Sequence, residues 1–161
     1  MPSPIVYDVN VLVQAVLSGR SQFSSWPVLP PATVNPAADC VGVANDCREF
    51  GLWLSPHILD NTRRVLIAAG MSQDLVDAYI AVLGEIAMAS GGDVIVPDRT
   101  VHDCPDHEDN LILDLAAEVG ALIVVSDDTD LTSMSPWRAT PILRPGEFAA
   151  RVDAMRRVRR R

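Results

Sequence analysis

Short apolar runs alternate with amphipathic stretches along most of the chain. The apolar runs predict five strands, at residues 4–8, 52–54, 93–96, 121–125 and 141–143. Between them, apolar residues recur at helical spacing and predict helices over residues 10–17, 36–50, 55–69, 106–119 and 145–155, with a further helix from residue 72 through residue 86. Strands separated by helices predict an α/β fold, in which helices cover both faces of a central, mostly parallel five-stranded sheet.

Several local signals mark the ends and faces of these elements. Ser55-Pro56 combines an N-cap residue with proline at the first helical position, and Gly70 ends the helix that follows. Residues 20–35 contain three prolines and four serines or threonines, which predicts a loop insertion. The helix that begins at Ser72 carries a stripe predicted to face the core, made of Leu75, Val76, Tyr79, Ile80, Leu83 and Ile86.

The composition is that of a globular protein. The chain has 161 residues, of which 48% are hydrophobic and 21% are charged, enough for one domain with its own core. No apolar run approaches the roughly 20 residues of a membrane span, and the N-terminus lacks the features of a signal peptide. Three cysteines argue against a disulfide framework and favour a reducing, cytoplasmic location. Cys40 and Cys47, two helical turns apart, are predicted to lie in the core.

Charge is distributed unevenly along the chain. Residues 1–150, predicted to form the domain, hold seven basic and 20 acidic residues, and residues 151–161 form an arginine-rich tail with a net charge of +5. The simplest interpretation of this segment is a disordered, solvated tail. The alternative is phosphate contact on RNA. The tail arginines that would make this contact are Arg156, Arg157, Arg159, Arg160 and Arg161.

Acidic residues follow three of the predicted structural boundaries. Asp8 ends the first strand, Asp106 and Asp109 open a helix on one helical face, and Asp127, Asp128 and Asp130 follow the apolar strand at 121–125. Each acid alone is better explained as a helix cap. At the carboxyl edge of one parallel sheet, however, these carboxylates would repel one another unless a cation lay between them. Ligands that are all oxygen favour Mg²⁺ or Mn²⁺.

Zinc is the alternative metal. His102 and His107 flank Cys104, but no cysteine pair or second ligand cluster completes a tetrahedral site. We therefore expect both histidines to be loop residues near the acidic site. His57 is expected in the first turn of its helix.

Taken in order, these motifs resemble the PIN domain family. The resemblance is carried by residues 7–12 (YDVNVL), 106–110 (DHEDN) leading into 113–116 (LDLA), 120–131 (GALIVVSDDTDL) and 141–148 (PILRPGEF). It implies a three-layer α/β/α fold and cleavage of RNA with Mg²⁺ or Mn²⁺. By position, Asp8, Asp109 and Asp128 would be the catalytic metal ligands, assisted by Asp130, while Asn10 and Ser126 would orient them.

The resemblance also suggests a biological setting. Many small bacterial members are VapC-like toxins, each paired with an antitoxin. It therefore implies an RNA substrate, a cognate antitoxin whose arginine or lysine enters the carboxylate cluster, and possible homodimerisation. The apolar positions at 75–86 would offer a dimer surface, although core packing explains them equally well.

One position departs from the family pattern. The family would have glutamate at Asn61, and asparagine lowers the charge of the site by one. Asp60 is adjacent but lies about 100° away around the helix. The non-enzymatic alternative is therefore a degenerate PIN domain that serves as an RNA- or protein-binding module.

Two other classes of α/β protein also place aspartates at strand ends. Phosphatases of the haloacid dehalogenase type have a second aspartate two residues after the one that ends the first strand, and this chain has Asn10 at that position. Both they and response-regulator receivers usually place a lysine beside the phosphate, and this chain contains no lysine. Both classes fit the sequence less well than a PIN domain does.

Overall fold

Four parallel strands form the centre of the protein. The computed structural model describes residues 1–17 and 35–161. Its strands are β1 (Ser3–Tyr7), β2 (Phe50–Trp53), β3 (Ile123–Val125) and β4 (Ile142–Leu143), in the spatial order β2-β1-β3-β4. The predicted loop at 20–35 lies outside the described residues except for Asn35.

The fifth predicted strand, at 93–96, joins the edge of the sheet through a single parallel bridge, so the sheet has five parallel segments as predicted. Val94 pairs in parallel with Leu54 beyond the edge of β2, so this segment extends the sheet by one residue only. Val96 is 79% exposed and Pro97, which has no N–H to donate, follows it, so the chain leaves the sheet there. The chain passes very close to β2 at Gly92, where only glycine fits: a Cβ atom at this position would lie 1.8 Å from the carbonyl oxygen of Leu52.

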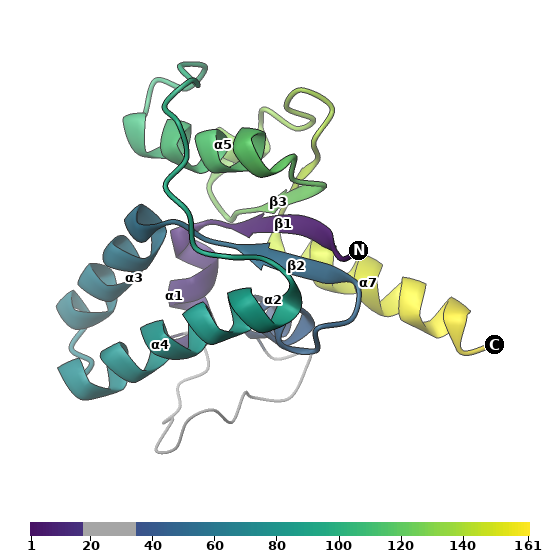
Figure 1. Ribbon diagram of the computed structural model, residues 1–161, viewed down its shortest axis with the longest axis horizontal. Coiled ribbons are helices and arrows are strands. Elements are labelled where there is room, and N and C mark those ends of the chain that lie inside the picture. Colours follow the sequence, from purple (N-terminus) through teal and green to yellow (C-terminus); the bar gives the residue numbers. More distant parts are fainter. Residues whose placement is uncertain (18–34) are drawn as a thin grey trace.

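Helices cover both faces of the sheet and give the predicted three-layer α/β/α arrangement (Figure 1). On one side lies α5; α1 to α4 lie on the other, and α7 packs against α2. A short helix, α6, was not predicted; it follows β3 directly. The helices are α1 (Val9–Leu17), α2 (Pro36–Asn45), α3 (Pro56–Ala68), α4 (Gln73–Ser90), α5 (His107–Val119), α6 (Thr129–Thr132) and α7 (Pro145–Arg159).

Side-chain caps fix where the helices begin. Ser55 accepts a hydrogen bond from the backbone N–H of Ile58, as the sequence predicted for α3. Asp106 caps α5 in the same way, and Gly120 ends α5 in the left-handed conformation. The helix predicted over 36–50 ends at Asn45, because the chain turns at Cys47 (φ 52°) to enter β2. Cys47 is therefore exposed, and the prediction that it lies in the core was wrong.

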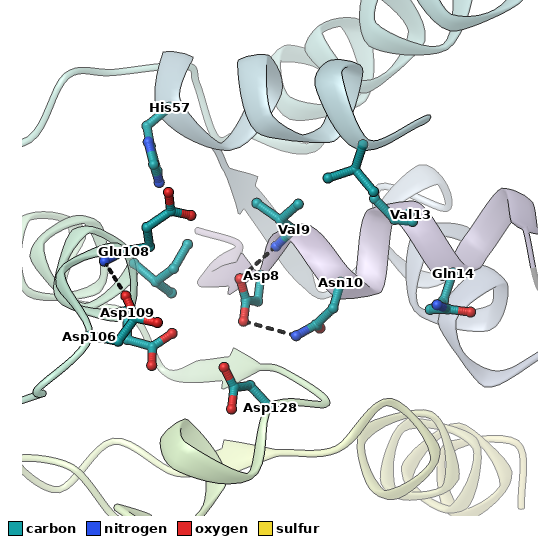
Figure 2. Close-up of a pocket in the computed structure, with 12 residues that line it drawn as sticks. Asp8, Val9, Asn10, Val13, Gln14, His57, Asp106, Glu108, Asp109 and Asp128 are labelled. Atoms are coloured by element: carbon teal, nitrogen blue, oxygen red, sulfur yellow. Dashed lines mark hydrogen bonds between the residues drawn. The ribbon is translucent and has the colours of Figure 1, made fainter. Parts of the chain in front are cut away.

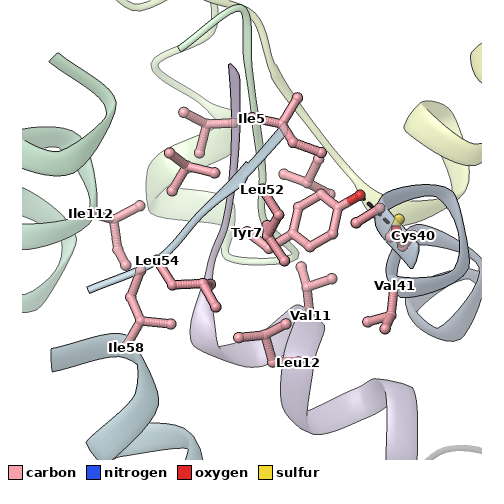
Figure 3. Close-up of a cluster of buried hydrophobic side chains, with 14 of the residues drawn as sticks. Ile5, Tyr7, Val11, Leu12, Cys40, Val41, Leu52, Leu54, Ile58 and Ile112 are labelled. Atoms are coloured by element: carbon pink, nitrogen blue, oxygen red, sulfur yellow. Dashed lines mark hydrogen bonds between the residues drawn. The ribbon is translucent and has the colours of Figure 1, made fainter. Parts of the chain in front are cut away.

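The core lies on both faces of the sheet, between the strands and the helices that cover them (Figure 3). Tyr7 is fully buried, and its hydroxyl donates to the carbonyl oxygen of Cys40, 2.6 Å away, which ties β1 to α2. The predicted stripe on α4 is mostly confirmed, because Val76, Tyr79 and Leu83 are fully buried. Leu75 is 36% exposed and lies off this face. The buried part of the stripe is thus used for core packing.

The arginine-rich segment continues α7 rather than forming a disordered tail. The helix runs to Arg159, so it passes the predicted end at residue 155. Arg156 is 18% exposed and bonds Glu49 at 2.8 Å and Asp46 at 2.7 Å, so it anchors α7 to the turn before β2. Arg157 pairs with Asp153, and residues 159–161 are exposed. Within the described ranges, no helix is both long and apolar enough to cross a membrane.

Candidate metal centre

The carboxyl edge of the sheet carries a cleft of about 330 Å³ (Figure 2). Three elements bring acidic side chains into it: Asp8 from the end of β1, Asp109 from the first turn of α5, and Asp128 from the turn between β3 and α6. These segments meet because β1 and β3 are neighbours in the sheet and end at the same edge. The three acids that the sequence placed at one sheet edge therefore do share one cavity.

Asp8 is held in a fixed orientation by three donors. One oxygen accepts from the backbone N–H of Val9 at 2.7 Å, and the other accepts from the Ser126 hydroxyl at 2.7 Å and the Asn10 amide at 3.1 Å. The residue is 7% exposed. Burial raises the pKa of Asp8, the hydrogen bonds from Ser126 and Val9 oppose this rise, and the charge of Asp128 adds to it.

Ser126 connects the two strand ends. Its hydroxyl hydrogen goes to Asp8, while its oxygen accepts from the backbone N–H of Asp128 at 3.0 Å and from the Asn10 amide at 3.4 Å. Asn10 in turn accepts from the backbone N–H of Asp127 at 3.0 Å. Asn10 and Ser126 thus join the loop after β3 to the loop after β1, and they fix Asp8 relative to Asp128.

A second group of carboxylates is packed closely but unpaired. Oxygen atoms of Asp109, Asp128 and Asp130 all lie within 4.8 Å of one another. Asp109 is 6% exposed, and its Oδ2 is buried without a hydrogen-bond partner. Desolvation raises the pKa of Asp109 to about 7, and the charges of Asp128, Asp106, Asp8 and Asp130 contribute further.

This donor set fits a hard divalent cation. A buried carboxylate oxygen with no donor, surrounded by other carboxylates, lacks the positive partner that would stabilise it. Oxygen-only ligands suit Mg²⁺ or Mn²⁺. Among the described residues, the cluster suited to a metal consists of the three aspartates and includes no histidine or cysteine. Cys104 is instead buried against Met134, with 3.0 Å between the sulfur atoms, which does not support the zinc alternative.

The remaining predicted site residues lie at different distances from this cluster. Asp106 lines the cleft, but it also caps α5 by accepting from the N–H of Glu108 at 2.9 Å. Asp60 is exposed on α3 and does not line the cleft. Asn61 contacts no carboxylate of the cluster: its amide lies against His57, and its oxygen accepts from Arg64 at 2.9 Å.

Two ionisable residues of the cleft wall, His57 and Glu108, were not predicted as site residues. His57 does occupy the first turn of α3, as expected, but it also lines the cleft opposite the acids. The signal was present in the sequence, because His57, Asn61 and Val65 are four residues apart and share one helix face. Glu108 lines the cleft as well.

Arg144, at the start of α7, ties down the loop that carries Asp128. Its guanidinium donates to the backbone oxygen of Asp127 at 3.0 Å and to the Asp127 carboxylate at 2.9 Å. It also lies 3.4 Å from the hydroxyls of Thr129 and Thr132 on α6. The loop after β3 is thus held on one side by Asn10 and on the other by Arg144.

Comparison with known families agrees with this geometry. The sequence profile of the PIN domain matches residues 4–130. The matched region begins at β1 and ends at α6, so it includes Asp8, Asp109, Asp128 and Asp130. A search of curated proteins gave no match.

Proposed function

The chain belongs to the PIN domain family, whose members are generally metal-dependent nucleases, and on that premise we propose that it is an endoribonuclease that uses Mg²⁺ or Mn²⁺. In this proposal Asp8, Asp109 and Asp128 are the catalytic metal ligands and Asp130 assists them. The RNA phosphodiester bond to be hydrolysed would lie in the cleft above these carboxylates.

The observation that carries the proposal is the unpartnered Oδ2 of Asp109. This atom is buried without a donor, and one oxygen of the same carboxylate lies within 4.8 Å of oxygens of Asp128 and Asp130. In a stable fold, such an arrangement of like charges calls for a cation. Helix capping explains Asp106 and Asp128, which bond backbone N–H groups, but it does not explain Asp109.

The residues of the chain have distinct tasks in this mechanism. A bound divalent ion would supply an activated water and would stabilise charge on the phosphorus oxygens. Asp8 keeps the orientation that Ser126, Asn10 and the Val9 N–H impose, and Oδ1, which accepts one hydrogen bond, would be the oxygen with a lone pair left for the ion. Asp109 stays close to Asp128 because α5 and the loop after β3 hold their backbones in place.

RNA binding requires positive charge that the domain mostly lacks. We propose that the exposed end of α7, with Arg157, Arg159, Arg160 and Arg161, adds a salt-sensitive contact to RNA phosphates. Arg156 contributes less to this contact, because it is already paired with Glu49 and Asp46.

The biological role that we propose is that of the toxin of a bacterial toxin–antitoxin pair in the cytoplasm. An acidic cleft of this kind suits inhibition by an antitoxin segment that places an arginine or a lysine among the carboxylates. Homodimerisation is part of the same proposal. A dimer surface would need residues other than Val76, Tyr79 and Leu83, which the core already buries.

A second candidate function follows from Asn61. Since this side chain bonds His57 and Arg64 rather than the acidic cluster, the domain lacks the fourth acid that the family resemblance implies. A PIN domain that binds RNA or protein without cutting is the corresponding alternative. The intact network around Asp8 favours the nuclease.

Cleavage of a mixed, structured RNA distinguishes the two functions. The purified protein is tested with Mg²⁺, with Mn²⁺ and with EDTA, beside Asp109→Asn and a control, Asp60→Asn, which removes an exposed acid of α3 outside the cleft. Metal-dependent cutting that is lost in Asp109→Asn and kept in Asp60→Asn supports the nuclease. Folded wild-type protein that binds several RNAs but cuts none of them supports the binding module.

A further inference from the structure

The part of the cleft wall that α3 forms carries a histidine and no acid, and Glu108 of α5 lies across from this histidine (Figure 2). His57, Asn61 and Val65 lie on one face of α3, and His57 and Val65 line the cleft. Figure 2 shows the His57 ring pointing into the cavity, toward Glu108. No hydrogen bond joins these two side chains in the described part of the chain. The ring is therefore available to a group that enters the cleft.

Arg64 fixes the orientation of the Asn61 amide. A guanidinium group can only donate, so the Asn61 oxygen, 2.9 Å from Nη2 of Arg64, is the acceptor. The NH₂ group of Asn61 must then face His57, whose ring nitrogens lie 3.0 Å and 3.2 Å away. Assignment of the amide thus follows from the bonding pattern.

This orientation determines what His57 can offer. The nitrogen of the Asn61 NH₂ group is nearly equidistant from both ring nitrogens, so the amide lies over the face of the ring and does not select one tautomer. An imidazole ring carries an N–H group in either tautomer, so His57 keeps a donor. Arg64 and Asn61 therefore hold the His57 ring, with its N–H donor, at the edge of the cleft.

The two walls of the cleft complement opposite parts of a phosphodiester with its metal ion. The acidic wall repels phosphate and accepts cations, so a phosphate can approach it only through a metal. The phosphate oxygens that face away from the metal need donors from another side. His57 lies on that side of the cleft. The positively charged Arg64 bonds the Asn61 side chain, which in turn contacts His57.

We infer that His57 is an RNA-contacting residue that donates a hydrogen bond to a phosphate oxygen of the bound substrate, and that Asn61 and Arg64 are positioning residues for its ring. The inference rests on the proposed ribonuclease function and adds a substrate contact to it. It also gives Asn61 a task that a glutamate could not perform, because a carboxylate would accept from His57 instead of donating to it.

The test measures RNA binding and metal binding separately. Affinity for a labelled RNA oligonucleotide is measured by fluorescence anisotropy with Ca²⁺ in place of Mn²⁺, and Mn²⁺ affinity is measured by calorimetry without RNA. The variants are His57→Leu, His57→Gln, Asn61→Leu, Arg64→Leu and Arg64→Lys. Arg63→Leu is the matched control, because Arg63 is the neighbouring arginine on α3 but pairs with Asp77 away from the cleft.

We expect His57→Leu to weaken RNA binding by roughly 10- to 150-fold, the range for one hydrogen bond to a charged group, with Mn²⁺ affinity unchanged. His57→Gln keeps a donor, and we expect it to retain part of the affinity. Asn61→Leu and Arg64→Leu should each weaken RNA binding by a smaller factor, with Arg64→Lys restoring much of the loss. Arg63→Leu should bind RNA like the wild type. Thermal melting of each variant shows that it is folded.

Three outcomes would overturn the inference. If folded His57→Leu and His57→Gln both bind RNA as the wild type does, while the wild type cuts RNA, the inference is wrong and the ribonuclease proposal stands. If His57→Leu loses Mn²⁺ affinity, His57 is a metal ligand instead. If the wild type neither binds nor cuts RNA with any divalent metal, the proposed function fails and the inference fails with it.

Discussion

In the metal-free protein, Asp109 carries a charge that the fold does not compensate. Its pKa lies at about 7 against an ordinary value of 3.8, so between these values the folded protein binds more protons than the unfolded chain. Asp109 therefore lowers the free energy of unfolding progressively as the pH rises from about 4 to about 7. Above pH 7 its contribution changes little. Asp109→Asn removes the charge while keeping the shape of the side chain.

The magnitude follows from the shift in pKa. About three pH units correspond to roughly 4 kcal/mol, which is an upper bound. The cleft is open to water, so screening reduces the effect, and we expect the metal-free variant to be more stable than the wild type by about 1–2 kcal/mol at pH 8. For a chain of this size the melting temperature would rise by roughly 2–8 °C.

The assay is thermal unfolding in EDTA at pH 5 and pH 8, followed by circular dichroism. The stability that Asp109→Asn gains over the wild type should be smaller at pH 5, because wild-type Asp109 is mostly protonated there. Adding Mn²⁺ should stabilise the wild type more than Asp109→Asn, because only the wild type keeps the full ligand set. Asp60→Asn, at an exposed position, should change stability by less than about 0.5 kcal/mol. An Asp109→Asn variant no more stable than the wild type at pH 8 would refute this reasoning.

Three further predictions concern other parts of the molecule. Ser126→Ala removes a 2.7 Å hydrogen bond to Asp8, so it should weaken Mn²⁺ binding in calorimetry by roughly 10- to 100-fold; unchanged affinity would contradict the orienting role. Arg156→Met leaves Glu49, whose side chain is 12% exposed, without its partner and should cost about 1–3 kcal/mol in urea unfolding, whereas the double variant with Glu49→Leu should recover much of the loss. Gly92→Ala would bring a Cβ to 1.8 Å from the Leu52 carbonyl oxygen, so it should cost at least about 3 kcal/mol or prevent folding; Gly84→Ala, at an open position, is its control.

Local signals in the sequence predicted the sheet and most of the acidic site. Asp8 directly follows β1, and residues 127–130 follow β3, so the rule for parallel sheets was sufficient to bring them to one edge. The starts of α3 and α5 were also predictable, because the Ser55 and Asp106 side chains accept hydrogen bonds from backbone N–H groups two or three residues further on. Such signals depend on a few consecutive residues.

Features that depend on distant contacts were not predicted. The edge segment at Val94 has the composition of a strand, but Pro97 and its place beyond β2 reduce it to one bridge. Cys47 shares the helical spacing of its neighbours and yet lies in the turn that leads to β2. The spacing of His57, Asn61 and Val65 shows that they share a face of α3, but it does not show that this face turns toward the acidic cleft. The ion pairs of Arg156 join residues more than a hundred positions apart.

The place of β3 between β1 and β4 has a consequence for synthesis of the protein. While a ribosome has released only the segment through β2, the nascent chain presents Asp8 without Ser126, Asp109 or Asp128. One edge of β1 also stays unpaired until β3 emerges and inserts beside it. An incomplete chain thus cannot assemble the acidic cluster, so the proposed nuclease would not cut its own messenger RNA until the segment through Asp130 has been translated.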